Sequence, residues 1–251
     1  MKGLALLAQI LAACQGNPPA RELDPKNPHS LTEHAVYNTR SRKSYETRFK
    51  ARLAVPNSAP LDYDGECVWV SPAVLYVHYT ASGGDDKKIV RAGDEAWVYH
   101  SLVGWVTDDE AGMTGAGRGI QNPDEILSVL ARHSGSARLR QPGTVEITLG
   151  GDDIERIMKG QVQQGSFDWK GSTATIELTV DGQNRIRKFT CDATLKSANP
   201  QVSGLVKYTG QVDLTDTDKA VELTFHDEKK KVIPLDNPIQ EAIHKVLKEK
   251  K

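Results

Sequence analysis

The sequence lacks the features that mark several large classes of protein. No apolar run reaches the roughly 18 residues of a membrane-spanning helix, and the only notable apolar run lies at the start of the chain. The net charge is −1, from 32 Lys and Arg against 33 Asp and Glu, whereas a nucleic-acid binder usually carries a basic face. Three cysteines are few for a disulfide framework. We therefore expect no nucleic-acid partner and no disulfide-based scaffold.

Motifs of catalysis and metal binding are also missing. There is no Gly-x-Ser-x-Gly elbow, and none of the seven histidines stands in a His-Glu-x-x-His or paired-Cys setting. The stretch from Gly115 to Gly119 resembles half of a phosphate loop but lacks the Gly-Lys-Ser/Thr ending. The acidic residues Asp213, Asp216 and Asp218 fit a polar hairpin turn better than a calcium loop. We expect no enzyme, no metal site and no cofactor.

Short runs with the composition of β-strands dominate most of the chain. From Gly65 to Val106, runs rich in Val, Ile, Trp and Tyr alternate with Gly, Asp and Pro, as in consecutive antiparallel strands. Further strands are predicted over 45–55, 145–149, 173–180, 186–195, 205–212 and 220–226, with a hairpin turn at Asp181-Gly182. No βαβ rhythm appears, so we predict a mainly β (α+β) fold with about ten antiparallel strands.

Helix signals are few and punctuate the strands. A capping box with Ser30 as N-cap and Glu33 at the third position predicts a helix over 31–42. Asn122-Pro123 predicts a second helix to residue 131, and Asp152 or Asp153 a third to residue 158. A last helix begins near Asn237 and carries an apolar stripe.

The N-terminal residues resemble an export signal. Gly3 to Ala13 is almost wholly small or aliphatic, and Leu11-Ala12-Ala13-Cys14 resembles the lipobox of bacterial lipoproteins. We expect a signal peptide over 1–13, lipidation of Cys14, a Pro-rich tether over 14–29 and one folded domain over 30–251. The alternative is a buried start to a cytosolic fold. This resemblance predicts a location at a bacterial cell envelope, facing the periplasm or the exterior, and Gln15 favours an outer membrane if the host has one.

The order of these motifs is similar to that of the bacterial outer-membrane lipoprotein carrier family and of related lipid-binding lipoproteins. The resemblance covers about residues 31–234. It rests on Gly65, Trp69, Val70 and Pro72, on Gly93 to Tyr99, and on the hairpin from Ile176 to Phe189. It implies an incomplete antiparallel β-barrel that is curled around an apolar cavity and covered by helices. It also implies a non-enzymatic role in holding lipid.

Nine apolar residues are candidates for the face that lines such a cavity. For each one, an ordinary place in the core is the alternative, and the central strands are apolar on both faces, so the sequence leaves open which set faces inward. The candidates are Trp69, Leu75, Val77, Tyr79, Trp97, Tyr99, Leu178, Val180 and Phe189.

The two cysteines other than Cys14 fall in predicted strands. In an oxidising envelope Cys67 and Cys191 could form a disulfide; the alternative is two buried free thiols.

Together these patterns predict an envelope lipoprotein that binds lipid or acylated-protein chains and carries or transfers them. Its expected partners are lipid, the membrane that holds its anchor, and an envelope protein that donates or accepts the cargo. The alternative is a sensor or scaffold of the same fold that binds a partner protein.

Overall fold

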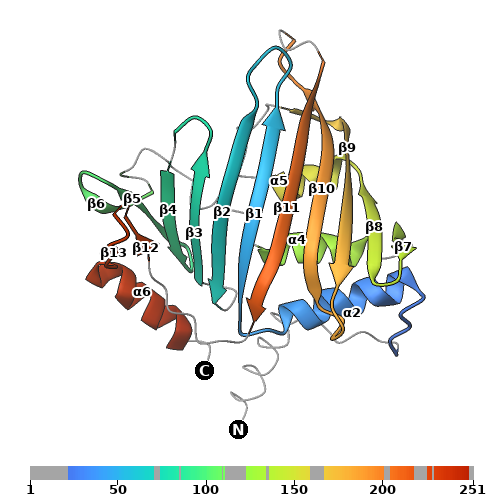
Figure 1. The fold of residues 1–251 in the computed structure, drawn as a ribbon, viewed down its shortest axis with the longest axis horizontal. Coiled ribbons are helices and arrows are strands. Elements are labelled where there is room, and N and C mark those ends of the chain that lie inside the picture. The colour runs from blue at the N-terminus through green and yellow to red at the C-terminus, as the bar shows by residue number, and fades with distance from the viewer. Residues whose placement is uncertain are drawn as a thin grey trace, which may run out of the picture.

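The computed structural model describes residues 22–70, 74–84, 86–108, 110, 123–133, 136–158, 167–200, 204–217, 225–227 and 229–248. Eleven strands form one antiparallel sheet in the order β6-β5-β4-β3-β2-β1-β11-β10-β9-β8-β7, and the sheet is curved but not closed (Figure 1). This confirms the predicted incomplete antiparallel barrel. The strands are β1 Ser44–Ala54, β2 Leu61–Val70, β3 Val74–Ala81, β4 Asp86–Ala92, β5 Glu95–His100, β6 Gly104–Thr107, β7 Arg138–Gln141, β8 Thr144–Leu149, β9 Phe167–Val180, β10 Ile186–Ser197 and β11 Leu205–Thr217.

The sheet consists of two meanders that meet at its centre. The first runs from β1 outward to the edge strand β6, and the second starts at the other edge with β7 and returns to β11. The last strand of the second meander pairs with the first strand of the first, from Tyr45 opposite Thr217 to Ala54 opposite Lys207. The longest strands, β9, β10, β11 and β1, are neighbours in and beside the middle of the sheet.

Three helices cover one face of the sheet, which we call the inner face. They are α2 Pro28–Arg40, α4 Pro123–Arg132 and α5 Gly151–Met158. Their apolar residues join one buried cluster with inward-facing strand residues, among them Tyr45, Trp69 and Leu178. Figure 1 views the sheet from the opposite, outer face, with α4 and α5 behind it.

A second, smaller core lies on the outer face. The helix α6 Asn237–Lys248 and the hairpin β12 Phe225–His226 with β13 Val232–Ile233 pack there over β3 to β6. Phe225 stacks on Tyr76 with ring centroids 5.4 Å apart, and Trp105 Nε1 donates to the Pro234 carbonyl at 2.9 Å. Where both faces of these strands are covered, as from Val74 to Val77, the strands are apolar on both sides.

The period of two predicted for residues 45–55 is confirmed in β1. Tyr45, Thr47 and Phe49 face inward, while Arg48 and Lys50 are exposed on the outer face. Alternate side chains of a strand point to opposite faces, and residues paired across strands share a face. The pattern in β1 therefore shows which side chains of β2 and β11 lie on the inner face.

The start of the first helix differs from the prediction. The N-cap of α2 is Asn27, whose side chain accepts hydrogen bonds from the backbone N–H groups of His29 and Ser30, and Pro28 follows in the first turn. Ser30 lies inside the helix, and its hydroxyl accepts instead from the Asp24 N–H at 3.0 Å. Leu23 packs against the inner core, so residues at the end of the predicted tether belong to the folded domain.

Two further predictions fall partly or wholly outside the described residues. Of the strand predicted over 220–226, the structure describes only β12, which pairs with β13 and lies outside the main sheet. The predicted signal peptide and Cys14 lie outside the described residues. Among the described residues, no helix has the length and apolar character that a membrane span requires.

Candidate functional site

The inner face is tightly filled where the three helices cover it. Tyr45 and Trp69 stack with ring centroids 4.6 Å apart and an interplanar angle of 17°. Trp69, Leu75 and Leu178 expose 3%, 1% and 0% of their surface. Such contact with neighbouring side chains leaves no room for a ligand at these positions.

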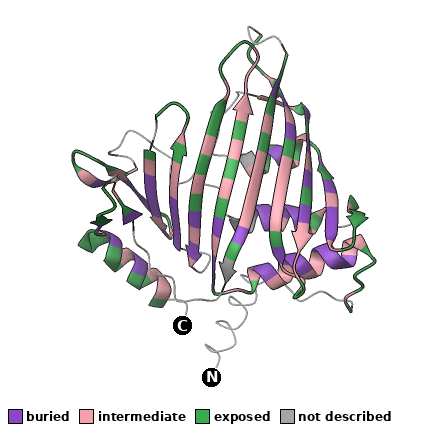
Figure 2. Ribbon diagram, in the orientation of Figure 1, coloured by how far each residue is buried: buried purple, intermediate pink, exposed green. Residues whose placement is uncertain are grey.

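Next to this filled region the inner face continues as a band of partly covered residues, which we call the half-buried band. Its members follow from the strand register and share intermediate burial, so they remain partly open to solvent (Figure 2). They are Phe189, Val212, Phe49, Gly65 and Tyr79 in one cross-strand row, Cys191, Gly210, Ala51, Tyr63 and Ala81 in the next, and Tyr208 and Leu53 beyond. None of these residues carries a formal charge.

Two glycines let aromatic rings lie flat on the band. A Cβ at Gly65 would stand 2.6 Å from Cζ of Phe49, and one at Gly210 would stand 2.9 Å from the hydroxyl of Tyr208. Tyr63 and Tyr79 meet edge to face at 6.2 Å. Because glycine has no side chain, the sheet surface above each of these residues is free for a neighbouring aromatic ring.

The environment of the band is apolar enough to disfavour charge. Burial raises the pKa of Tyr208 to about 12, with smaller contributions from the neighbouring Cys191 and Tyr63. Burial likewise raises the pKa of the Cys191 thiol to about 12. The band therefore has a low local polarity although part of its surface is open.

The structure does not bring all nine sequence candidates together. Seven lie in the inner cluster or pack against it, whereas Trp97 and Tyr99 belong to the outer core under α6. The reason is the register. Trp97 pairs with Val90 and so shares its face, while Val98 pairs with Ile89 on the inner face. Of the seven, Trp69, Leu75, Val77 and Leu178 are buried, and Tyr79, Val180 and Phe189 are partly exposed.

A disulfide between Cys67 and Cys191 is excluded by the sheet order. Both thiols are free. Cys67 is in β2 and Cys191 in β10, with β1 and β11 between them. Three strand spacings amount to about 14 Å, whereas bridged cysteines have Cα atoms about 4.4–6.8 Å apart. Strand assignment alone could not show this, because it does not give the order of strands.

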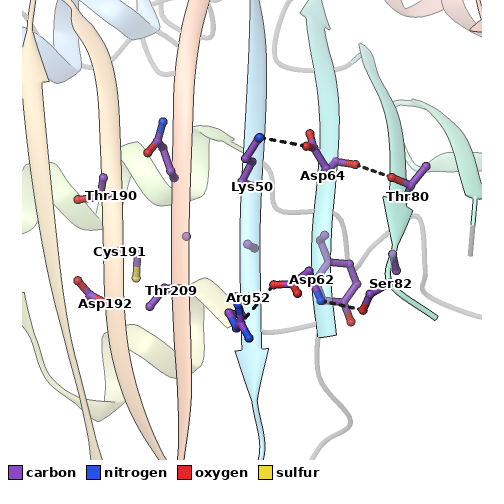
Figure 3. A pocket seen from close by; sticks show the side chains of 15 residues that line it. Lys50, Arg52, Asp62, Asp64, Thr80, Ser82, Thr190, Cys191, Asp192 and Thr209 are labelled. Carbon is purple, nitrogen blue, oxygen red and sulfur yellow. Dashed lines mark hydrogen bonds and ion pairs between the residues drawn. The ribbon is translucent and has the colours of Figure 1, made fainter. Parts of the chain in front are cut away.

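A pocket of about 700 Å³ lies on the outer face and is not the apolar cavity that we expected (Figure 3). Its walls are two rows of polar side chains that alternate with inward-facing residues of β3, β2, β1, β11 and β10. Lys50 pairs with Asp64 at 3.4 Å and Arg52 with Asp62 at 3.7 Å. These ion pairs make the outer pocket unsuited to an apolar chain.

Most residues of the half-buried band were not predicted from the sequence. Phe49, Leu53, Tyr63 and Tyr208 were not among the candidates. The alternation in β1 and the isolated Gly65 and Gly210 within strand patterns were the available signals, since a glycine inside a strand often marks a close approach.

Comparisons with known proteins give partial likenesses. No family model and no curated protein matches the sequence. Among solved structures, the chain is similar to the lipoprotein LppX of Mycobacterium tuberculosis, with 12% identity, a TM-score of 0.44, and coverage of 77% of this chain and 96% of that one. It is also similar to a LolA superfamily protein of Nitrosomonas europaea, with 13% identity, a TM-score of 0.35 and coverage of 78% and 95%.

A third likeness is to an outer membrane lipoprotein-sorting protein domain of Vibrio parahaemolyticus, with 7% identity, a TM-score of 0.32 and coverage of 79% and 95%. With identities this low and partial superposition, the function has to be argued from the chain's own side chains.

Proposed function

We propose that the protein is a cell-envelope lipoprotein, without enzymatic activity, that binds lipid or acylated-protein chains on the half-buried band and carries or transfers them. In this proposal residues 1–13 are a signal peptide, and Cys14 carries the lipid anchor that holds the domain at a membrane.

The observation that carries the proposal is the contrast within the inner face. Trp69 and Leu178 are covered by helices, whereas Phe49, Tyr79 and Tyr208 are apolar or aromatic, contiguous with that core, and partly open. Burying apolar surface stabilises a complex by about 25 cal/mol per Å². An acyl chain that covers the band would therefore gain free energy without displacing any ion pair.

The test is lipid binding by the mature protein and by two matched variants. Phe49→Gln places a polar amide in the band, and Arg48→Gln makes a change one residue away on the exposed outer face. We expect co-purified lipid in native mass spectra of the parent and of Arg48→Gln, and at least tenfold weaker binding of a fluorescent acyl probe by Phe49→Gln. Lipid-free spectra across several preparations, or equal probe binding by all three proteins, would refute the proposal.

A second candidate function, binding of a partner protein as a sensor or scaffold, is favoured by a different place. Leu102 and Val103 are 86% and 68% exposed in the turn between β5 and β6. Exposed apolar residues at a hairpin tip suit contact with another surface. The double variant Leu102→Ser, Val103→Ser would then lose a stoichiometric partner in pull-down experiments and keep its lipid content unchanged.

A further inference from the structure

Formal charge is scarce on the inner face of β1 to β5 and β11, and it has one sign there. The ladder fixes which side chains of β1 to β5 and β11 face inward. Only two of these inward positions carry a formal charge at pH 7, Lys87 and Arg91, and both are on β4. The inner face of these strands is therefore apolar with a positive strip along one strand.

Lys87 lies next to the end of one row of the half-buried band. It pairs with Tyr79, which pairs with Gly65, and the row continues through Phe49 and Val212 to Phe189. Lys87 is half-buried, and it forms no ion pair within the part of the chain that the structure describes. Its neighbour Lys88, by contrast, is buried on the outer face with its Nζ 2.7 Å from Asp86.

Arg91 lies four residues further along the same strand face. It pairs with the buried Leu75 and Ala96, and its Nε is buried with no hydrogen-bond partner among the described residues. Burial lowers the pKa of Arg91, and the nearby Cys67 and Asp94 oppose this effect. A partly desolvated guanidinium with an unpaired N–H donor favours an anion nearby.

The length of the row suits one lipid chain with its head. From β10 to β4 there are five strand spacings, or about 24 Å. One leaflet of a bilayer has a hydrocarbon thickness of about 15 Å, half of the roughly 30 Å core. A chain of membrane length that began at Tyr79 would therefore end within the row, with its head group beside Lys87.

We propose that the ligand of the inner face is an anionic phospholipid, whose phosphate pairs with Lys87 and whose acyl chain lies along Tyr79, Phe49, Val212 and Phe189. Arg91 provides the second positive charge of the strip. This inference rests on the proposed lipid-binding function and adds the charge of the head group. Among anionic amphiphiles, phospholipids are the ones that membranes supply in bulk, and Lys is a common partner of phosphate.

The experiment compares head groups on matched chains. The mature full chain is incubated with vesicles of phosphatidylcholine, or of phosphatidylcholine with phosphatidylglycerol of the same acyl chains, and the lipid bound per protein is counted by native mass spectrometry. We expect about tenfold preference for phosphatidylglycerol, which falls with added salt. Lys87→Gln should reduce this preference to about one, because phosphatidylglycerol, which has no cationic choline, loses more binding than phosphatidylcholine does, while Lys87→Arg should retain the preference.

Lys207→Gln is the matched control, because Lys207 is an exposed lysine on the outer face of β11. It should keep the full preference. Equal binding of the two phospholipids by the parent protein would overturn the head-group inference and leave the proposed function standing. Binding of neither phospholipid would count against both. Palmitate that binds in a Lys87-dependent way, while phosphatidylglycerol does not, would overturn the assignment to a phosphate.

Discussion

The substitution Gly65→Ala tests whether the half-buried band is packed as the structure has it. The new Cβ would stand 2.5 Å from the His78 carbonyl oxygen, 2.6 Å from Cζ of Phe49 and 2.7 Å from Cβ of Tyr79. Comfortable separations between such atoms are about 3.5 Å or more, so a shift of about 1 Å is needed. The Phe49 ring can turn away, but His78 and Tyr79 are held by the β2–β3 ladder.

Overpacking of this kind costs about 1–3 kcal/mol, and we expect the upper end because two of the three contacts cannot relax by a side-chain rotation. The restricted unfolded chain of the alanine variant offsets about 0.4–1 kcal/mol of this. A net loss of about 2 kcal/mol should appear as a lower urea midpoint with an unchanged slope, followed by tryptophan fluorescence. The displaced Phe49 ring should also weaken binding of an acyl probe.

The control for this experiment is Gly83→Ala. A Cβ at Gly83 has nothing within 4 Å and its backbone does not adopt a positive φ, so the variant should be as stable as the parent. A loss of less than about 0.5 kcal/mol for Gly65→Ala, within the range of ordinary surface changes, would refute the packing described for β2 and β3.

Three further predictions concern other parts of the molecule. Asn27→Ala should lower the unfolding free energy by about 1 kcal/mol in urea titrations, because the Asn27 side chain caps α2. An unchanged unfolding free energy would show that Asn27 is not the residue that caps this helix. Burial raises the pKa of the Cys67 thiol from 9.0 to about 12, against weaker opposing effects of Thr47 and Arg91. Its contribution to stability is thus complete below pH 9 and lost as the pH rises toward 12, so the fall in unfolding free energy over this range should be shallower in Cys67→Ala. His133 Nε2 lies 2.8 Å from a carboxylate oxygen of Asp153, and this pair joins the end of α4 to the start of α5. Asp153→Asn should speed amide exchange in residues 126–132, and exchange at the parental rate would show that the pair does not hold α4.

Local patterns predicted most of the fold, because the signals of its strands, turns and helices each span only a few consecutive residues. The alternation from Tyr45 to Val55 gave β1 and its facing, and Asp181-Gly182 gave the hairpin between β9 and β10. The start of α2 was placed too late because Ser30 and Glu33 match a capping box, although Asn27 followed by Pro28 is a competing start signal that won.

Local patterns could not predict the order of the strands in the sheet or the face of the sheet on which each apolar residue lies. Trp97 and Trp69 stand in similar apolar runs, and only the pairing of β4 with β5 shows that they lie on opposite faces. The separation of Cys67 from Cys191 depends on β11 returning to pair with β1, a contact between distant parts of the chain. The apolar cavity was expected from the fold, but the helices α2, α4 and α5 fill much of the inner face.

The most direct test of lipid binding on the inner face is photo-crosslinking. Mature protein loaded with a phospholipid that carries a photoreactive group in its acyl chain would be irradiated and digested, and the modified peptides identified by mass spectrometry. We expect adducts on peptides that contain Phe49, Tyr79 and Phe189. Adducts confined to the outer face, on α6 or on the residues of the polar pocket, would contradict it.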